Sequence, residues 1–276
     1  APTIQENSPA DWAHQLTATA SPTSHKYTRG HLVIVGGEKM TGAARIAATS
    51  ARRAGAGLVT LAVPETSFDI YASDDPGNLI ESRTDFAACI TDKRRRTVLL
   101  GPGLGIGQEN RELVLSALMG GERCVILDAD ALTSFADDPA ELFNAIQGPV
   151  IMTPHDGEFA RLFDTDSDKL SRARNAAKKA NAVIVLKGAD TVIAAPDGRT
   201  RINANAPPWL ATAGSGDALS GIIAGLAANG SDAFDAASAG VWLHGQAGQC
   251  VGPGLIAEDI ADVLPAVLDS LFFEPA

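Results

Sequence analysis

The sequence is poor in cysteine, and this shortage removes two classes of protein. Its 276 residues include only three cysteines, at positions 89, 124 and 250, and none forms a Cys-x-x-Cys pair or a cluster with histidine. Neither a disulfide framework nor a zinc site is therefore readable from the sequence. Isolated cysteines of this kind are typical of small buried hydrophobic residues, and they fit a reducing cytoplasm, which is the expected location.

Positive charge is scarce as well. The chain carries 22 lysines and arginines against 33 aspartates and glutamates, which gives a formal net charge of −11. Nucleic acids and anionic membranes bind basic surfaces, so neither is an expected partner. A small anionic ligand is compatible with this charge, because a helix N-terminus or a backbone nest can hold a phosphate group without net positive charge.

Long apolar runs are missing, although apolar residues are not. No stretch approaches the roughly 20 residues of a membrane-spanning helix, and the polar start of the chain lacks the apolar core of a signal peptide. Hydrophobic residues still make up 45% of the chain, which is ample for a core. This length fits one large α/β domain or two small ones, and no linker or repeat divides it. We predict a single domain, residues 1–276, with residues 1–28 as an arm or leading helix.

Two common nucleotide-binding motifs are also absent. The sequence contains no G-x-x-x-x-G-K-[ST], which excludes a P-loop protein. The segment GPGLGIG (101–107) places glycine at every second position, which is the wrong spacing for G-x-G-x-x-G. A Rossmann dehydrogenase is therefore disfavoured.

What the sequence does contain is an alternation of short apolar runs with alanine-rich helical patterns. Six runs are strand candidates: 31–37, 58–64, 97–101, 124–129, 149–154 and 182–188. Helical patterns such as 42–56 and 108–121 lie between most of them. Continuous apolar strands separated by helices are typical of a parallel sheet covered on both faces. Residues 191–205 then predict a hairpin with its turn at 196–198, and the chain after residue 213 is expected to be almost wholly helical.

The loops that follow the strand candidates are rich in glycine and polar residues. In open α/β sheets, ligands bind at the carboxyl ends of the strands, so these loops are expected to meet at one edge. The five loops are 36–37, 101–105, 128–130, 153–158 and 187–191. Loop 101–105 offers backbone donors for a ligand, although a tight turn explains its glycines equally well. Together the five loops favour a nucleotide site.

The segment LATAGSGDALSGIIAGLAANG (210–230) contains the most distinctive candidate. Gly214 and Gly216 let backbone N–H groups approach a ligand, and the following helix adds partial positive charge at its N-terminus. This arrangement suits a phosphoryl group in transfer, and Asp217 could accept a proton from a hydroxyl nucleophile. The residues alone leave open an ordinary capped helix with Asp217 placed favourably on its dipole.

Five other loop positions carry side chains with the chemistry of such a site. His155 could hydrogen-bond a substrate, and Glu158 could contact Mg²⁺ through water or simply be an acid at a helix start. Lys187 could neutralise phosphate, although an exposed lysine at a turn is the simpler explanation. Asp128 and Asp130 could line a pocket, but the pattern favours caps, with Asp130 as an N-cap.

Taken in order, these motifs resemble a known family. The segments MTGAARIAATSARRAGAGLVTLAVPE, GPGLG, LDADAL, TPHDGEFARL, VLKGADTVI and PPWLATAGSGDALSGIIAG are similar to those of the ADP/ATP-dependent NAD(P)H-hydrate dehydratases of the ribokinase-like superfamily. The likeness runs from about residue 28 to about residue 270. It implies a ribokinase-like α/β fold, with a mostly parallel central sheet and helices on both faces.

The resemblance also implies an activity. Family members are lyases that return hydrated NADH or NADPH to the reduced coenzyme, at the expense of ADP in typical bacterial members and ATP in eukaryotic ones. The kinase-like fold implies phosphorylation of the ring hydroxyl followed by elimination of phosphate, with Mg²⁺ as cofactor. Family members are often homotetramers, so we expect a homo-oligomer. Bifunctional members carry an epimerase domain, and this chain is too short for one, which predicts a standalone dehydratase.

Site residues carry over by position. Asp217 resembles the base, and Glu158 resembles the superfamily's Mg²⁺-associated acid. The anion hole corresponds to Gly214, Ser215 and Gly216, and the hydrate-binding positions to Ala43, Gly105, His155 and Asp217. The adenine-nucleotide site corresponds to Lys187, Gly188, Ala189, Asp190, Thr191 and Gly216. Local departures at Glu38-Lys39 and Asp156 affect the shape of the hydrate pocket and remove no catalytic group.

Two other classes of function use the same motif. A small-molecule kinase of this superfamily, similar to hydroxyethylthiazole kinase, would also use GSGD but would release a phosphorylated product. The segment TPHDGEFARL together with GPGLG favours the dehydratase over that kinase. A non-catalytic nucleotide-binding module is the third possibility, and the presence of Asp217 argues against it.

Overall fold

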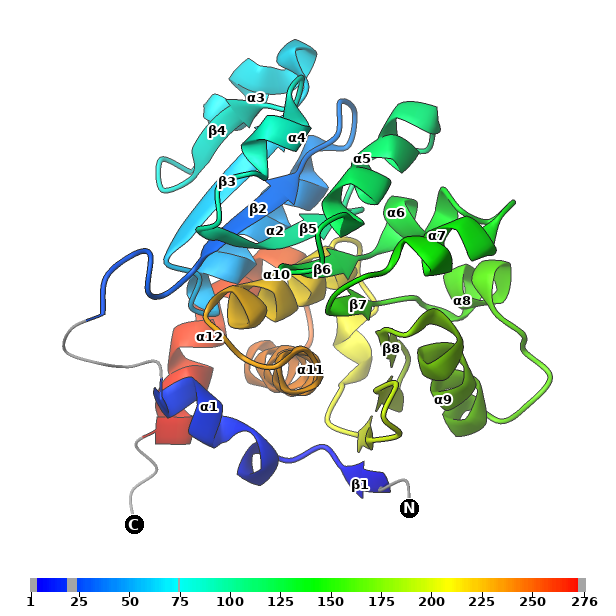
Figure 1. The fold of residues 1–276 in the computed structure, drawn as a ribbon. Helices are drawn as coiled ribbons and strands as arrows, with labels where there is room; N and C mark the ends of the chain where they lie inside the picture. Colours follow the sequence, from blue (N-terminus) through cyan, green and yellow to red (C-terminus); the bar gives the residue numbers. More distant parts are fainter. Residues whose placement is uncertain (1–3, 19–23, 74, 273–276) are drawn as a thin grey trace.

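A central β-sheet organises the chain (Figure 1). The computed structural model describes residues 4–18, 24–73 and 75–272. Within these residues the sheet has ten strands in the order β1-β10-β9-β8-β7-β6-β5-β2-β3-β4. The strands are β1 (Ile4–Glu6), β2 (His31–Val35), β3 (Leu58–Val63), β4 (Leu79–Ser82), β5 (Arg95–Leu100), β6 (Cys124–Leu127), β7 (Val150–Met152), β8 (Val183–Leu186), β9 (Thr191–Ala194) and β10 (Thr200–Asn203).

All six predicted strands are present, as β2, β3, β5, β6, β7 and β8. These strands and β4 run parallel to one another. Strand β9 forms the predicted antiparallel hairpin with β10 and also pairs antiparallel with β8. Each predicted run extends one or two residues past its strand, for example to residue 37 where β2 ends at Val35, because the terminal glycines and polar residues belong to the loops. The mostly parallel sheet is therefore confirmed.

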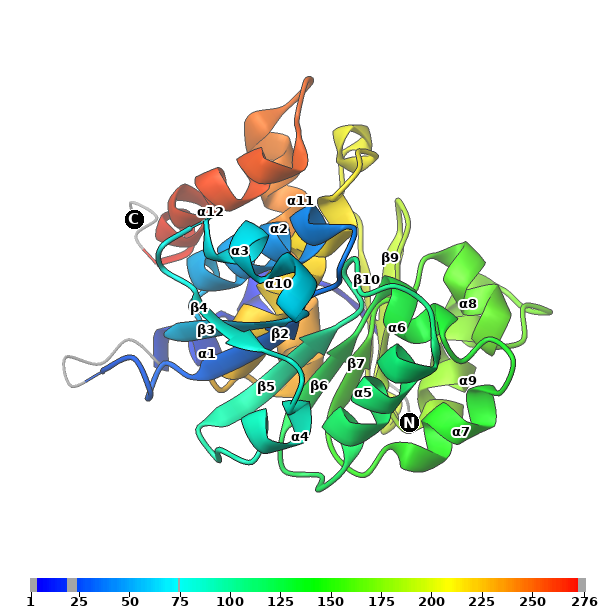
Figure 2. The ribbon, with the colours of Figure 1, turned by 90° about the horizontal axis from the view of Figure 1, so that it is seen from above.

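Helices cover both faces of this sheet (Figures 1 and 2). They are α1 (Ala13–Ala18), α2 (Thr41–Arg53), α3 (Phe68–Ala72), α4 (Phe86–Cys89), α5 (Gln108–Leu118), α6 (Ala129–Thr133), α7 (Pro139–Ala145), α8 (Asp156–Leu162), α9 (Lys169–Ala180), α10 (Ser215–Ala228), α11 (Ala233–Val251) and α12 (Ala257–Phe272). Three 3₁₀ turns complete the set: η1 (Pro9–Asp11), η2 (Glu65–Ser67) and η3 (Pro208–Leu210). No helix in the described ranges has the length and apolar character needed to cross a membrane.

Strand β2 shows how one run of apolar residues serves both faces. Side chains alternate along a strand, so Leu32 and Ile34 join the core beneath α2, α10, α11 and α12. Val33 and Val35 join the core beneath α4 to α9. A strand buried on both faces must be apolar at every position, which is why these runs were recognisable.

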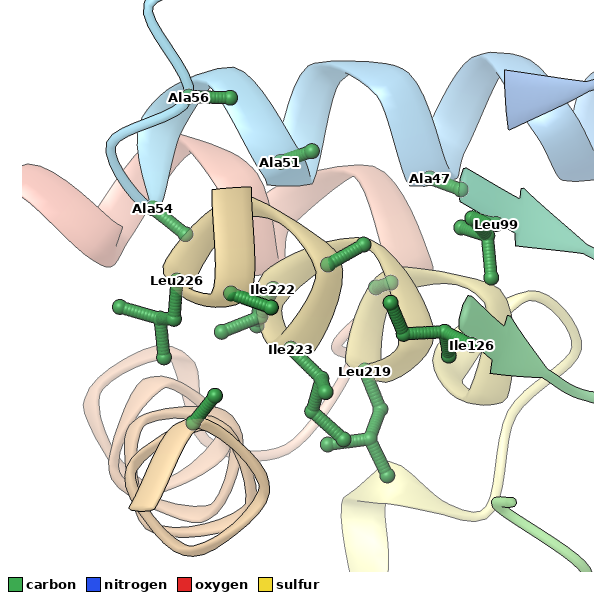
Figure 3. Packing of buried hydrophobic residues seen from close by; sticks show 14 of the residues in the cluster. Ala47, Ala51, Ala54, Ala56, Leu99, Ile126, Leu219, Ile222, Ile223 and Leu226 are labelled. Carbon is green, nitrogen blue, oxygen red and sulfur yellow. The ribbon is translucent and has the colours of Figure 1, made fainter. Parts of the chain in front are cut away.

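Nearly every residue of helix α10 is buried. Its glycines let α2 approach closely (Figure 3). Ala47 and Ala51 of α2 face α10 in this packing. A Cβ added at Gly221 would lie 2.2 Å from the carbonyl oxygen of Ala47, and one at Gly225 would lie 2.3 Å from that of Ala51. This register makes the two helices parallel. Their N-termini therefore lie at the same end, where β2 delivers the chain to α2.

The leading residues are more ordered than the predicted arm. Strand β1 pairs with β10, and Trp12 is buried with its ring centroid 5.7 Å from that of Trp242 in α11. Helix α1 follows, so a leading helix is present, but the strand was not predicted. Strands β1 and β4 lie at the two edges of the sheet and lack the continuous apolar run by which the central strands were predicted. Residues 1–3 and 19–23 of the predicted arm lie outside the described residues.

The three cysteines are all free. Cys89 and Cys124 are half-buried, while Cys250 is exposed near the end of α11. The expectation of buried cysteines is therefore wrong for Cys250, because the last turn of α11 leaves the core. Burial raises the pKa of the Cys89 thiol to about 11, which keeps it protonated near neutral pH.

Candidate active site

The N-terminus of α10 lies at the carboxyl edge of the sheet, as its sequence predicted. Gly214 is the N-cap residue and has φ of +84°, a left-handed conformation that favours glycine. Its Cβ would also lie 2.9 Å from the Cβ of Ala257, so a larger residue would clash. The first N–H groups of a helix have no acceptor within it. The start of α10 therefore offers donors and partial positive charge to an anion.

Asp217 lies in the first turn of this helix and is half-buried. Burial and the neighbouring carboxylate of Asp128 raise its pKa to about 6, and Lys187 opposes part of this increase. Asp130 and Glu158 make smaller contributions to the same increase in pKa. A carboxylate whose pKa lies near neutrality is a stronger base than an ordinary aspartate and is still largely ionised at neutral pH, which suits proton transfer.

Lys187 follows β8 and is held inward. Its Nζ lies 2.9 Å from Oδ1 of Asp128 and 3.8 Å from Oε2 of Glu158. Burial opposes its charge, but these carboxylates raise the pKa of Lys187, so it stays cationic. A Cβ at Gly216 would lie 3.6 Å from Lys187 Nζ, which places the amine beside the start of α10. The interpretation as an exposed lysine at a turn is therefore wrong, because the side chain is 18% exposed and ion-paired.

His155 and Glu158 form the N-terminal cap of α8. His155 Nδ1 accepts hydrogen bonds from the N–H groups of Gly157 (2.9 Å) and Glu158 (3.2 Å), and Glu158 Oε2 accepts one from the N–H of His155 at 2.9 Å. Because Nδ1 accepts, the proton of the neutral ring is on Nε2, which lies 3.4 Å from Glu158 Oε1. The prediction that Glu158 is an acid at a helix start is therefore confirmed. The Mg²⁺ role is a separate prediction.

The residues that could serve Mg²⁺ do not form a cage of their own. Among residues 4–18, 24–73 and 75–272, no three His, Cys, Asp or Glu side chains form a group able to hold a metal ion. Both carboxylate oxygens of Glu158 already face protein donors. Mg²⁺ commonly binds through one or two carboxylates, several waters and the phosphates of a substrate. The donor set fits an ion that arrives with those phosphate and water ligands.

The prediction of Asp130 as an N-cap is wrong. The N-cap position of α6 belongs to Asp128, and neither side chain caps the helix. Asp128 is engaged by Lys187, and Asp130 Oδ2 accepts a hydrogen bond from the N–H of Gly105 at 2.8 Å. Both aspartates thus connect neighbouring strand-end loops instead of satisfying their own helix.

Ala43 and Gly105 belong to a separate surface at the same edge of the sheet, formed by the start of α2 and loop 101–105. A Cβ at Gly103 would lie 3.1 Å from the Cβ of Ala43, so the loop and the helix are in contact. Asn110 Nδ2 donates to the carbonyl oxygen of Gly105 at 3.0 Å and fixes the loop from α5. Through Asp130, this surface joins the group of carboxylates around Asp217.

A pocket of about 640 Å³ opens beside the start of α10. Its lining includes Ser215 and His155, and five of the predicted nucleotide positions: Lys187, Gly188, Ala189, Thr191 and Gly216. Apolar residues from segment 206–212, with Leu219 and Val241, form another wall. The sixth predicted position, Asp190, does not line the pocket; it is exposed and pairs with Lys169 Nζ at 2.7 Å. Ala43, Gly105, Gly214 and Asp217 lie outside the lining.

His244, which no sequence pattern indicated, also lines this pocket. Its Nε2 lies 3.0 Å from both the carbonyl oxygen and Oγ of Ser215. Burial lowers its pKa to about 4, so the ring is neutral, and a carbonyl can only accept, so Nε2 carries the proton. His244 thereby braces the start of α10. It was missed because it lies within an apolar helix and not in a strand-end loop.

The fold is ribokinase-like. A ribokinase-like superfamily protein from Enterococcus faecalis superposes with a TM-score of 0.84, covering 97% of this chain and 96% of its own, at 23% identity. The sequence pattern of the NAD(P)H-hydrate dehydratase family matches residues 31–261. The chain therefore belongs to the NAD(P)H-hydrate dehydratase family.

Named relatives fall into two groups by length. The bifunctional NAD(P)H-hydrate repair enzyme of Moorella thermoacetica is 38% identical over 284 residues, covering 95% of this chain and 53% of the relative. This chain thus spans about half the length of such bifunctional relatives. The ADP-dependent (S)-NAD(P)H-hydrate dehydratase of Xanthomonas campestris is 32% identical, covering 91% of this chain and 92% of the relative.

A solved structure shares both sequence and fold with the chain. The ADP/ATP-dependent NAD(P)H-hydrate dehydratase of Bacillus subtilis, co-crystallised with ATP/Mg²⁺, is 30% identical with a TM-score of 0.80. The match covers 91% of this chain and 93% of that one.

Proposed function

We propose that the chain is an ADP-dependent (S)-NAD(P)H-hydrate dehydratase, which returns hydrated NADH or NADPH to the reduced coenzyme. Family membership and the names of its relatives support the activity. One observation of the site carries the proposal. Asp217, with a pKa near neutrality, lies on the same helix N-terminus that closes one side of the 640 Å³ pocket.

The residues support a sequence of two chemical steps. Asp217 takes the proton of the ring hydroxyl while the hydroxyl oxygen attacks the terminal phosphorus of the nucleotide. A new O–P bond forms, the P–O bond to the rest of the nucleotide breaks, and AMP leaves when the donor is ADP. The C–O bond of the phosphate ester then breaks, and inorganic phosphate leaves with the former hydroxyl oxygen and the bonding electron pair. The adjacent ring carbon loses a proton to solvent, and the electrons of that C–H bond form the double bond of the dihydropyridine.

The other residues stabilise charge as the phosphoryl group moves. The N–H groups of Gly214, Ser215 and Gly216 form the proposed anion hole at the start of α10. Lys187, kept cationic by its carboxylate partners, faces the same place. Ala43, Gly105 and His155 are the proposed contacts of the hydrate.

The nucleotide and its metal have assigned places in this proposal. The adenine nucleotide occupies the pocket beside Lys187 to Thr191 and Gly216, with Asp190 at the exposed rim. Glu158 would hold Mg²⁺ through water, and the ion would neutralise phosphate charge when bound. The name of the X. campestris relative supports ADP, and that of the B. subtilis relative allows ATP.

Three further properties are part of the proposal. We assign the enzyme to the cytoplasm, as a single domain over residues 1–276, and we expect it to assemble as a homotetramer. The family resemblance supports the assembly, and the three free thiols fit a reducing compartment. Sedimentation velocity at micromolar concentration tests the tetramer, and a monomer would contradict it.

The activity is tested by incubating the protein with hydrated NADH, Mg²⁺ and either ADP or ATP. We expect NADH absorbance to return, with ADP supporting the faster rate and one AMP formed per NADH. Absence of recovery with either nucleotide would contradict the proposal. Nucleotide consumption with a stable phosphorylated product would instead identify a small-molecule kinase.

A further inference from the structure

The leading segment, residues 4–18, joins the sheet through β1, and one buried asparagine just after that strand adds side-chain hydrogen bonds. Asn7 Oδ1 accepts a hydrogen bond from Trp12 Nε1 at 3.1 Å, and Asn7 Nδ2 donates to Asn203 Oδ1 at 2.9 Å and to the carbonyl oxygen of Ser238 at 2.7 Å. Asn203 ends β10 and Ser238 lies in α11, so Asn7 bridges the two elements. Its own backbone N–H donates to Ile202 at 2.9 Å.

The chain of amides continues from Asn203 to the pocket. Asn203 Nδ2 donates to Asn205 Oδ1 at 2.7 Å, and Asn205 Nδ2 donates to the carbonyl oxygen of Trp242 in α11 at 2.9 Å. We call Asn7, Asn203 and Asn205 the amide chain. The next residue after its last member, Ala206, begins the segment 206–212, which supplies the apolar wall of the pocket.

This segment has little freedom to move independently of α11. A Cβ at Gly245 would lie 2.0 Å from Asn205 Oδ1, and one at Gly248 would lie 2.8 Å from Leu210 Cγ. Gln249 Nε2 also donates to the carbonyl oxygen of Asn205 at 2.7 Å. Segment 206–212 therefore packs directly on α11. Its position along that helix is set by the contacts that hold Asn205.

Burial makes the amide chain sensitive to its first member. Asn7 is 5% exposed and Asn203 is 1% exposed, so neither amide can replace a lost partner with water. In a buried network each group orients the next, and loss of one member releases its neighbours. Removal of the Asn7 amide leaves Asn203 Oδ1 and the Ser238 carbonyl without this donor, at the point where β10 and α11 are joined.

We propose that Asn7 is a positioning residue for the nucleotide pocket: by joining β10 to α11 through the amide chain, it sets the wall formed by residues 206–212. This inference rests on the proposed function, which assigns the pocket to an adenine nucleotide. The leading segment is then part of the nucleotide-binding apparatus, although it touches no nucleotide.

The test compares Asn7→Ala with Gln15→Ala, both in the leading segment. Gln15 attaches the segment through Asp235 and the N–H of Asp232, and neither of these hydrogen bonds involves the amide chain. ADP affinity is measured by titration calorimetry, with KM values and kcat from the dehydration assay. We expect Asn7→Ala to raise the Kd and KM for ADP about fivefold or more, with kcat and the KM for the hydrate within about twofold of wild type. Gln15→Ala should lower Tm but leave the Kd for ADP unchanged.

An unchanged Kd for ADP in Asn7→Ala overturns the inference, as does an equal increase in Gln15→Ala. If Asn7→Ala does not fold, hydrogen exchange of the wild type decides. Since coupling between two sites is reciprocal, ADP should slow exchange in both residues 204–212 and residues 4–12. Slowing confined to 204–212 overturns the inference. If the wild type binds no ADP, the nucleotide assignment itself fails, and this inference fails with it.

Discussion

At the scale of single residues, the site depends on charges kept in an unusual balance. Lys187 pairs with Asp128 and Glu158. These two carboxylates and Asp130 repel the charge of Asp217, and this repulsion combines with burial to make Asp217 a stronger base. A paired aspartate on the surface would instead have a lowered pKa and would be a poor base. The same arrangement lowers stability, because the folded protein must accommodate a charge that it disfavours.

We therefore predict that Asp217→Asn stabilises the protein at neutral pH. A folded pKa of about 6 against an unfolded value of 3.8 means that the folded state binds more protons between these values. The stability contributed by protonated Asp217 is complete below the unfolded pKa and is lost as pH rises through about 6. Asparagine avoids this loss, so the variant should be more stable by roughly 1–3 kcal/mol at about pH 8.

Urea unfolding of both proteins at about pH 8 and about pH 4.5 measures this difference. Other titrating groups largely cancel in the comparison between variant and wild type. The stability gain should shrink at the lower pH. A gain of equal size at both pH values, or a loss at about pH 8, would show that the pKa of Asp217 is not raised.

At the scale of secondary-structure elements, the site is built where two parallel helices begin. Gly221 and Gly225 let α10 approach the backbone of α2, and this close packing fixes the start of α10 relative to Ala43. Figure 3 shows Leu99 and Ile126 of the sheet packed beside the same helix. The long apolar run after Asp217 is therefore the buried helix that holds the proposed base in place.

Gly221→Ala should disrupt that support. The added methyl group would lie 2.2 Å from the carbonyl oxygen of Ala47. Its nearest atoms all belong to the backbone of Ala47, which cannot rotate away as a side chain could. We expect a loss of about 3 kcal/mol in the free energy of unfolding. Gly42→Ala is the matched control in α2, since nothing lies within 4 Å of its added Cβ and alanine favours a helix. Equal stability of the two variants in urea unfolding would contradict the close-packing argument.

At the scale of the whole molecule, strands buried on both faces can be predicted from the sequence. Edge strands and contacts between residues distant in the sequence cannot. Central strands were recognisable because both of their faces are buried, whereas β1 and β4 at the sheet edges carry no such pattern. The strand-end loops do converge, which brings Lys187, Asp128 and Glu158 together. No local pattern could reveal that His244 contacts Ser215, or that Asn7 contacts Asn203. Those pairs are distant in sequence and meet only through the tertiary fold.

In the proposed reaction, Asp217 is the base of a nucleotide-driven dehydration. The most direct measurement compares kcat of wild type and Asp217→Asn with hydrated NADH, ADP and Mg²⁺. General-base catalysis contributes factors of about 10² to 10⁴, so kcat should fall by at least about a hundredfold while ADP still binds. The wild-type rate should also fall as pH decreases below about 6, in line with protonation of Asp217. A variant that keeps wild-type kcat, or a wild-type rate that does not change between about pH 5 and 7, would show that Asp217 is not the base.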